Sequence, residues 1–215
     1  MPTLLGASRV RSRDPLRSAH APLRARSARS ACYAHLTRFA PLRTRFAARR
    51  FAGGMRFDVR FDYSAPAFQR QFEDSLQRTG LGRSEALVIH DLEPRELGGL
   101  DKAREHLGVL RGGGFPKLQA MRAAGTIRAF GAGVNAAEDG EDVALKDQWN
   151  VEYVDALLTM HEGTEGDDRG IDFFLLANMY SLLNLSAHDL GILDKCEQSG
   201  VGIVVGGPYV KKRLV

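Results

Sequence analysis

Short runs of mostly apolar residues alternate along the chain with segments in which apolar residues recur every three or four positions. The runs fall at 86–89, 127–130, 171–176 and 201–205, and Arg128 and Asp172 are the charged residues within them. A run of this kind predicts a strand buried on both faces, as in a parallel sheet covered by helices. Because these strands alternate with helices, the pattern predicts βαβ units and an α/β fold.

The first helical segment carries clear start and stop signals. Phe68, Phe72 and Leu76 recur at intervals of four, Ser64 can cap the helix, and Gly80 can end it. The same reasoning predicts helices over 117–124, 150–160 and 186–196.

Two other regions have weaker patterns. Alternating apolar and polar residues over 57–61 predict a half-exposed strand. The glycine clusters at 98–99 and 112–114 bracket a region that we expect to be an insertion, partly helical.

Positive charge is concentrated at the N-terminus. The first 56 residues hold 13 arginines, no lysine and one acidic residue, so they carry +12, whereas the rest of the chain carries −8. A segment rich in Arg, Ala and Ser and poor in acids has the composition of an organelle transit peptide. We therefore expect residues 1–54 to be a disordered basic segment directed to the mitochondrion or the chloroplast, and 55–215 to form the folded domain.

A basic segment has alternative interpretations. It can be a disordered arm of a cytoplasmic protein, or a tail that binds nucleic acid through its charge. Scattered arginines without lysine or interleaved aromatic residues favour targeting, so we expect no nucleic-acid partner.

Composition excludes several further classes of protein. Cys32 and Cys196 are the only cysteines, too few for a disulfide framework or a cysteine metal site. No apolar run approaches the ~18 residues that a membrane span needs. The pair His161-Glu162 lacks the second histidine of a zinc-protease helix. We therefore expect a soluble protein without a metal centre or a membrane partner.

The glycines at 131 and 133 form a relaxed dinucleotide-binding pattern. Gly131-x-Gly133-x-x-Ala136 follows a predicted strand, and such glycines let a pyrophosphate approach a helix N-terminus. The acidic residue expected ~20 positions later has no good counterpart, since Glu152 lies inside a helical pattern. A tight strand-to-helix turn is the simpler interpretation.

Read in order, several stretches resemble the aldo-keto reductase superfamily, in particular its branch of D-threo-aldose, L-fucose and pyridoxal dehydrogenases. The resemblance implies part of a (β/α)8 barrel, roughly strands four to seven with their helices. It also implies an oxidoreductase that uses NAD or NADP to oxidise an aldose or a related polyol or alcohol, a small-molecule substrate. The stretches are FDYS at 61–64, FEDSLQRTGL at 72–81, LVIHDLEP at 87–94, AGTIRAFGAGVN at 124–135, LLANMYSLL at 175–183 and GVGIVVGGPY at 200–209.

The resemblance implies roles for individual residues as well. His90, at the end of the run 86–89, falls on the catalytic histidine, which orients the substrate oxygen and stabilises charge on it. Asn135 falls on a residue that binds the nicotinamide carboxamide. Gly206 and Gly207 fall at a cofactor-binding strand end, where many relatives have a tyrosine under the nicotinamide ring. Asp91 has no role that the family assigns, and a solvated strand end is its default interpretation.

Other parts of the family pattern have no counterpart in the sequence. The proton-donating tyrosine, its lysine and its aspartate belong to the first three strands, and the cofactor's adenosine phosphate binds near the eighth. We therefore expect a chain truncated at both ends of the barrel, with little activity of its own. The alternative is a non-catalytic fragment that acts as an interaction or regulatory protein.

Overall fold

A computed structural model describes residues 3–5, 11–12, 57–160 and 170–209 of the 215-residue chain. The chain forms two compact units, one of Met1–Ala7 with Phe61–Val215 and the other of Ser8–Arg60. In the smaller unit, β2 (Arg11–Ser12) pairs antiparallel with β3 (Phe57–Asp58). The larger unit carries the candidate site.

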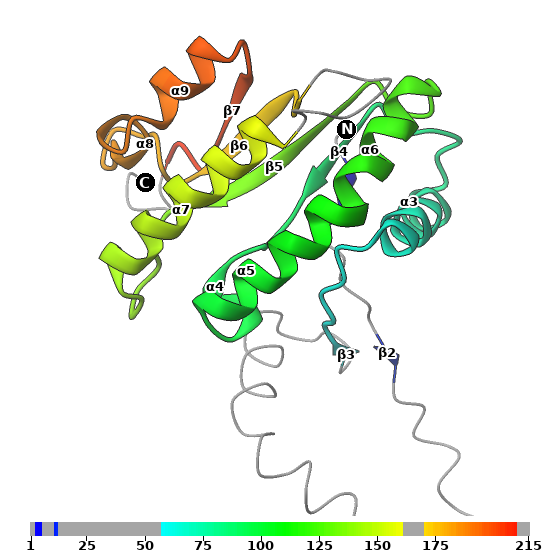
Figure 1. The fold of residues 1–215 in the computed structure, drawn as a ribbon, viewed down its shortest axis with the longest axis horizontal. Helices are drawn as coiled ribbons and strands as arrows, with labels where there is room; N and C mark the ends of the chain where they lie inside the picture. Colours follow the sequence, from blue (N-terminus) through cyan, green and yellow to red (C-terminus); the bar gives the residue numbers. More distant parts are fainter. Residues whose placement is uncertain (1–2, 6–10, 13–56, 161–169, 210–215) are drawn as a thin grey trace, which may run out of the picture. The chain divides into compact units, whose positions relative to one another are not determined.

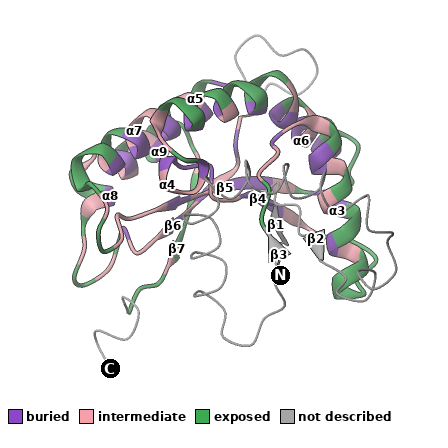
Figure 2. Ribbon diagram, turned by 90° about the horizontal axis from the view of Figure 1, so that it is seen from below, coloured by how far each residue is buried: buried purple, intermediate pink, exposed green. Residues whose placement is uncertain are grey.

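The larger unit is built on a five-stranded parallel sheet in the order β1-β4-β5-β6-β7 (Figure 1). The helices of this unit lie along one face of the sheet (Figure 2). Because all the strands are parallel, their carboxyl ends meet at one edge, which is where (β/α)8 barrels place their sites. The predicted partial barrel is therefore confirmed. The strands are β1 (Thr3–Leu5), β4 (Ala86–Ile89), β5 (Ala129–Asn135), β6 (Phe173–Ala177) and β7 (Gly202–Gly206).

The helices follow the strands in alternation. They are α3 (Ala65–Thr79), α4 (Pro94–Leu97), α5 (Leu100–Val109), the π-helical turn η2 (Leu110–Gly114), α6 (Phe115–Ala123), α7 (Val143–Thr159), α8 (Ser186–Asp189) and α9 (Ile192–Gln198). Gly80 ends α3 in the left-handed conformation, with φ +67°, as predicted. Ser64 occupies the N-cap position, but its side chain makes no capping hydrogen bond. Its backbone N–H instead donates to Oδ1 of Asp62 over 3.1 Å.

Two short strands fall within the N-terminal segment that the composition predicts to be disordered. We expected no strand among residues 1–54, but Thr3–Leu5 pairs in parallel with β4, and Arg11–Ser12 pairs with β3. A three-residue strand is too short to produce a periodic signal in the sequence, which explains the miss. The other residues of this segment lie outside the described ones, so targeting stays a prediction.

The glycines lie where the resemblance to barrel strands implies, rather than in a dinucleotide-binding turn. Gly131 and Gly133 lie inside β5 rather than in a strand-to-helix turn, which removes the dinucleotide-binding pattern as an explanation. The glycines at 112–114 do not break a helix, because η2 joins α5 to α6 without interruption. At Gly114 a Cβ would lie 2.5 Å from Cε2 of Phe68, so this residue is needed for close packing against the α3 segment.

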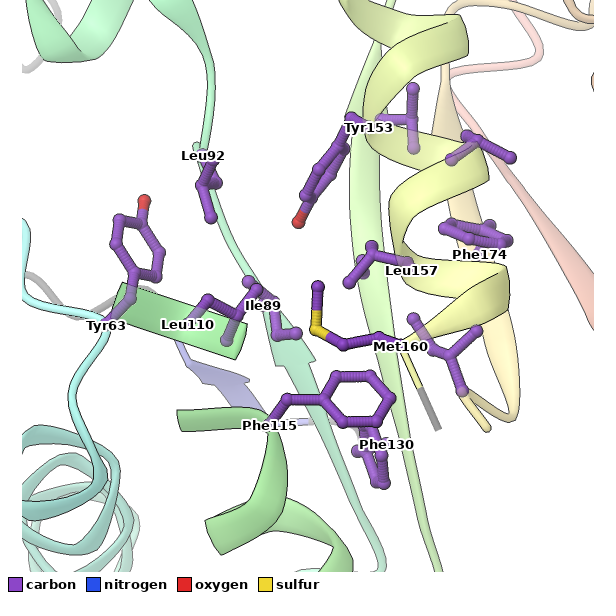
Figure 3. Close-up of a cluster of buried hydrophobic side chains, with 14 of the residues drawn as sticks. Tyr63, Ile89, Leu92, Leu110, Phe115, Phe130, Tyr153, Leu157, Met160 and Phe174 are labelled. Atoms are coloured by element: carbon purple, nitrogen blue, oxygen red, sulfur yellow. The ribbon is translucent and has the colours of Figure 1, made fainter. Parts of the chain in front are cut away.

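The core lies between the sheet and its helices (Figure 3). Phe130 of β5 meets Phe115 of α6 edge to face, with ring centroids 5.1 Å apart. On β6, Phe174 and Leu176 are buried, and the alternate residues are half-buried. Complete burial of one such side chain contributes ~1.5–3 kcal/mol, so the face toward the helices supplies most of the stability.

Strand β7 is less buried than its apolar sequence predicts. Ile203, Val204 and Val205 are 38%, 47% and 38% exposed. The pairing pattern explains this, because β7 is an edge strand with β6 on one side only.

Candidate functional site

Polar residues and glycines gather where four neighbouring strands end. His90 and Asp91 follow β4, Asn135 is the last residue of β5, Asn178 follows β6, and Gly207 follows β7. The register sets three of the strand ends in one row, since Asn135 pairs with Ala177 and Ala177 pairs with Gly206. The sheet therefore brings the sequence-predicted residues Asn135, Gly206 and Gly207 to the edge where β4 delivers His90.

The backbone at His90 is held by a buried tyrosine. The hydroxyl of Tyr63 donates to the carbonyl oxygen of His90 over 2.8 Å, and Tyr63 is fully buried. Burial raises the pKa of Tyr63 well above its ordinary value, and the nearby Tyr153 and the charge of Asp91 add to this rise. Tyr63 therefore stays a neutral donor, with a structural role that its sequence did not reveal.

The imidazole of His90 contacts the carboxylate of the next residue. Nδ1 of His90 lies 3.0 Å from Oδ2 of Asp91, and the two side chains are 42% and 16% exposed. Asp91 has a φ of +50°, which is uncommon for a residue other than glycine. The histidine thus presents an exposed ring whose one nitrogen faces an anion.

A buried ion pair lies behind Asn135. The ammonium group of Lys146, near the start of α7, donates to Oε2 of Glu93, and both residues are buried. Burial lowers the pKa of Lys146 to about 8, although the negative charge of Asp91 acts in the opposite direction. The other oxygen of the carboxylate, Oε1, accepts from Nδ2 of Asn135 over 3.3 Å.

This contact fixes the orientation of the Asn135 amide. A carboxylate can only accept, so the NH2 group of Asn135 must face Glu93 and its Oδ1 must face away. The backbone oxygen of Asn135 accepts from Nδ2 of Asn150 over 3.0 Å. Helix α7 also reaches the end of β4, because Nε1 of Trp149 donates to the oxygen of Leu92 over 3.0 Å.

Two glycines end β7 against Asn178. A Cβ at Gly207 would overlap Oδ1 of Asn178, and one at Gly206 would lie 3.0 Å from Cδ2 of Leu175. Gly207 also has a φ of +66°, so a side chain there would be strained as well as crowded. Oδ1 of Asn178 is buried and has no hydrogen-bond partner in the described part of the chain.

The sequence did not reveal Glu93, Lys146, Asn150 or Asn178. Glu93 was visible in the LVIHDLEP stretch, but nothing indicated its partner 53 positions away. Lys146 and Trp149 precede the predicted start of their helix at 150, whereas α7 begins at Val143. An aspartate at 142 that caps this helix was the signal available, since its Oδ1 accepts from the N–H of Leu145 over 3.1 Å.

Two classes of site find no support among the described residues. No group of three or more His, Cys, Asp or Glu side chains is placed to hold a metal ion there. In the same residues, no helix has the length and apolar character to cross a membrane.

The strand order, the single layer of helices and the polar strand ends define a partial (β/α)8 barrel with its site at the carboxyl edge. The sequence matches no family model. It is 32% identical over 157 residues to pyridoxal 4-dehydrogenase from Microbacterium luteolum, which is 73% of this chain and 39% of that protein. With the motifs lying in order on β4 to β7, the chain belongs to the aldo-keto reductase superfamily and represents part of its barrel.

Solved structures show the same partial likeness. A glycerol dehydrogenase from Gluconobacter oxydans gives a TM-score of 0.49 at 13% identity, over 98% of this chain and 41% of that one. A putative aldo-keto reductase from Pseudomonas aeruginosa gives a TM-score of 0.42 at 22% identity, over 68% and 44%. The chain thus spans less than half of each of these relatives.

Proposed function

We propose that the protein is an oxidoreductase of the aldo-keto reductase type that oxidises an alcohol with NAD or NADP. The observation that supports this most is the 32% identity to pyridoxal 4-dehydrogenase over 73% of the chain. The substrate class that follows is an aldose or a related polyol or pyridoxal-type alcohol, which loses a hydride from carbon and a proton from its hydroxyl oxygen.

The proposal assigns roles to residues at the strand ends. His90 contacts the substrate oxygen, where an imidazole can orient that oxygen by a hydrogen bond and stabilise the charge that changes on it. Its ring is partly exposed, and its backbone is held by Tyr63, so it has both access and a fixed position.

Asn135 and the end of β7 would hold the cofactor. The amide oxygen of Asn135 faces away from Glu93, so it is an acceptor suited to the NH2 group of a carboxamide. Gly206 and Gly207 carry no side chain that would cover the strand end. A nicotinamide bound there supplies the acceptor for the hydride that leaves the alcohol carbon.

Binding and turnover together test this proposal on the full chain. Trp149 is the only tryptophan and hydrogen-bonds beside the site, so its fluorescence should be quenched when NADH or NADPH is added. Initial rates with NAD⁺ or NADP⁺ and a panel of aldoses, polyols and pyridoxal should show substrate-dependent reduction of the nucleotide at a low rate, since the family's proton-donating tyrosine and its lysine have no counterpart in the sequence. His90→Ala should lower that rate by ~10²-fold or more.

The matched control is His188→Ala, which removes an exposed histidine on α8 and should leave binding and rate unchanged. A chain that binds neither nucleotide and reduces neither would contradict the proposal. That result would favour an interaction or regulatory role instead.

A further inference from the structure

Glu93 stands where a side chain could cap a helix, but its carboxylate is used elsewhere. The residue occupies the N-cap position of α4 and makes no capping hydrogen bond with its side chain. The carboxylate instead accepts from the ammonium group of Lys146 at Oε2 and from the NH2 group of Asn135 at Oε1. Glu93 and Lys146 are 8% and 5% exposed, so water competes little with these contacts.

The backbone of Asn135 is fixed independently of its side chain. Asn135 pairs with Ala177 in the sheet, and its backbone oxygen accepts from Nδ2 of Asn150 over 3.0 Å. The side-chain amide has two orientations of nearly the same shape and opposite hydrogen-bonding character. One orientation presents an acceptor to a bound group, and the other presents a donor.

The ion pair decides between these two orientations. An ammonium group beside a buried carboxyl group favours its ionised form, and an ionised carboxylate has no hydrogen to donate. With Oδ1 of Asn135 toward Glu93, two acceptors would face each other, which disfavours that orientation by ~10-fold or more. The NH2 group of Asn135 therefore stays on Glu93, and this preference depends on the charge of Lys146.

We infer that Glu93 and Lys146 are positioning residues that hold the Asn135 amide with its oxygen toward the bound cofactor. The site then selects a nicotinamide ring, whose carboxamide offers an NH2 donor, over a nicotinic acid ring, whose carboxylate offers only acceptors. This inference rests on the proposed use of a nicotinamide cofactor and adds two residues to it. Both residues act through Asn135, so their effect is on cofactor selection.

Exchanging the two charges tests the inference. In Glu93→Lys/Lys146→Glu the buried ion pair remains, but position 93 carries an ammonium group that can only donate. The amide of Asn135 should then turn its oxygen toward position 93 and its NH2 group toward the cofactor. Calorimetric titration of the full chain measures the affinity for NAD⁺ or NADP⁺ and for the counterpart with nicotinic acid. The titration is run at pH 7, below the pKa of about 8 for Lys146, so that the lysine is charged.

The wild type should bind the nicotinamide nucleotide at least ~10-fold more tightly than its nicotinic acid counterpart. The exchanged variant should lose or reverse this preference, and a general loss of stability would not change the ratio of the two affinities. The matched control is Arg104→Glu/Glu152→Arg, which exchanges an ion pair whose side chains are 45% and 33% exposed and should keep the wild-type ratio. A ratio that the exchange at 93 and 146 leaves unchanged would overturn the inference.

Urea unfolding decides the same point without a ligand, also where the exchanged variant does not fold. Asn135→Asp places a second carboxylate against Glu93, so its unfolding equilibrium constant should exceed that of Asn135→Ala by ~10-fold. In Glu93→Gln this difference should shrink, because a glutamine amide can donate to the aspartate. The same difference in both backgrounds, or none in either, would overturn the inference. A chain that binds neither nucleotide but shows the expected unfolding pattern would support the orienting role of Glu93 and contradict the proposed function.

Discussion

Gly131 on β5 is paired with Phe173 on β6, and the phenylalanine ring lies where a side chain at residue 131 would be. A Cβ there would lie 2.5 Å from Cε2 and 2.6 Å from the backbone oxygen of Phe173. The ring can turn, but the backbone oxygen cannot leave the strand. The glycine is therefore required by the close approach of two strands.

Gly131→Ala should destabilise the fold by ~2–3 kcal/mol, the upper part of the range for overpacking a core. Gly133→Ala, two residues along the same strand, is the control because its Cβ would meet only the oxygen of Ile89 at 3.6 Å. Urea unfolding of both variants measures the difference. Equal loss of stability in the two variants would show that strand propensity, rather than the contact with Phe173, sets the cost.

A second prediction concerns the buried guanidinium of Arg122. Its side chain is only 1% exposed. Nη1 donates to Oδ2 of Asp172 over 2.6 Å and to the backbone oxygen of Gly170 over 2.9 Å. The guanidinium carbon also lies 4.7 Å from the ring centroid of Phe130. Arg122→Met removes the charged partner of Asp172, which keeps only the backbone N–H of Phe130, and the donor to the oxygen of Gly170, so unfolding free energy should fall by ~3 kcal/mol.

The control for Arg122→Met is Arg128→Met. Arg128 pairs with Glu85 over 2.9 Å, but its side chain is 79% exposed, and removing it should cost less than ~0.5 kcal/mol. If thermal and urea unfolding rank the two variants in the opposite order, burial is not what gives the Arg122 interaction its strength.

The third prediction is a dependence of stability on pH through Lys146. Burial lowers the pKa of its ammonium in the folded protein to about 8, below the ordinary pKa of 10.5 for a lysine side chain. Between these values the unfolded chain binds more protons than the folded one, so this residue makes the fold more stable as pH rises from about 8 to about 10.5. Below about 8 both states are protonated, and the contribution is flat.

Lys146→Met lacks this titration. The unfolding free energy of the wild type, relative to Lys146→Met, should therefore increase across that window in guanidinium titrations at matched pH values. A decrease across the same window would show that the partner Glu93 holds the proton on Lys146 more strongly than burial expels it.

The fourth prediction concerns the thiol of Cys196 on α9. The residue is fully buried, and burial raises its pKa to about 11. Since thiolate is the reactive form, the native thiol should react with a disulfide reagent at neutral pH at least ~100-fold more slowly than the same thiol in urea. The measurement is made in Cys32→Ser, so that one thiol remains. Equal rates in buffer and in urea would show that α9 opens readily from the sheet.

The strand predictions succeeded where the apolar runs were strong. Residues 86–89 were predicted as a strand and form β4, because a parallel strand under helices must be apolar on both faces. The C-terminal helix was predicted as one element over 186–196, but Gly191, with φ +67°, divides it into α8 and α9. The apolar pattern continues through this break, so periodicity alone could not locate it.

The candidate site was only partly predictable for a different reason. His90 and Asn135 stand at strand ends within recognisable motifs, whereas Glu93 and Lys146 become neighbours only when α7 packs beside β4. Long-range pairs of this kind leave no local pattern in a single sequence. The neighbouring sequence likewise does not predict the left-handed backbone conformation of Asp91.

The position of β1 at the far edge of the sheet, next to β4, has a consequence for the order of assembly. Its pairing joins Thr3 to Leu87, 84 positions apart, whereas β4 joins β5 across 43 positions and β6 joins β7 across 29. Each doubling of the length of a loop adds only ~0.6 kcal/mol to the entropic cost of closing it. A strand of three residues makes few contacts, so it offsets little of this cost. Folding should therefore spread from the C-terminal strands toward β4, with Thr3–Leu5 pairing last.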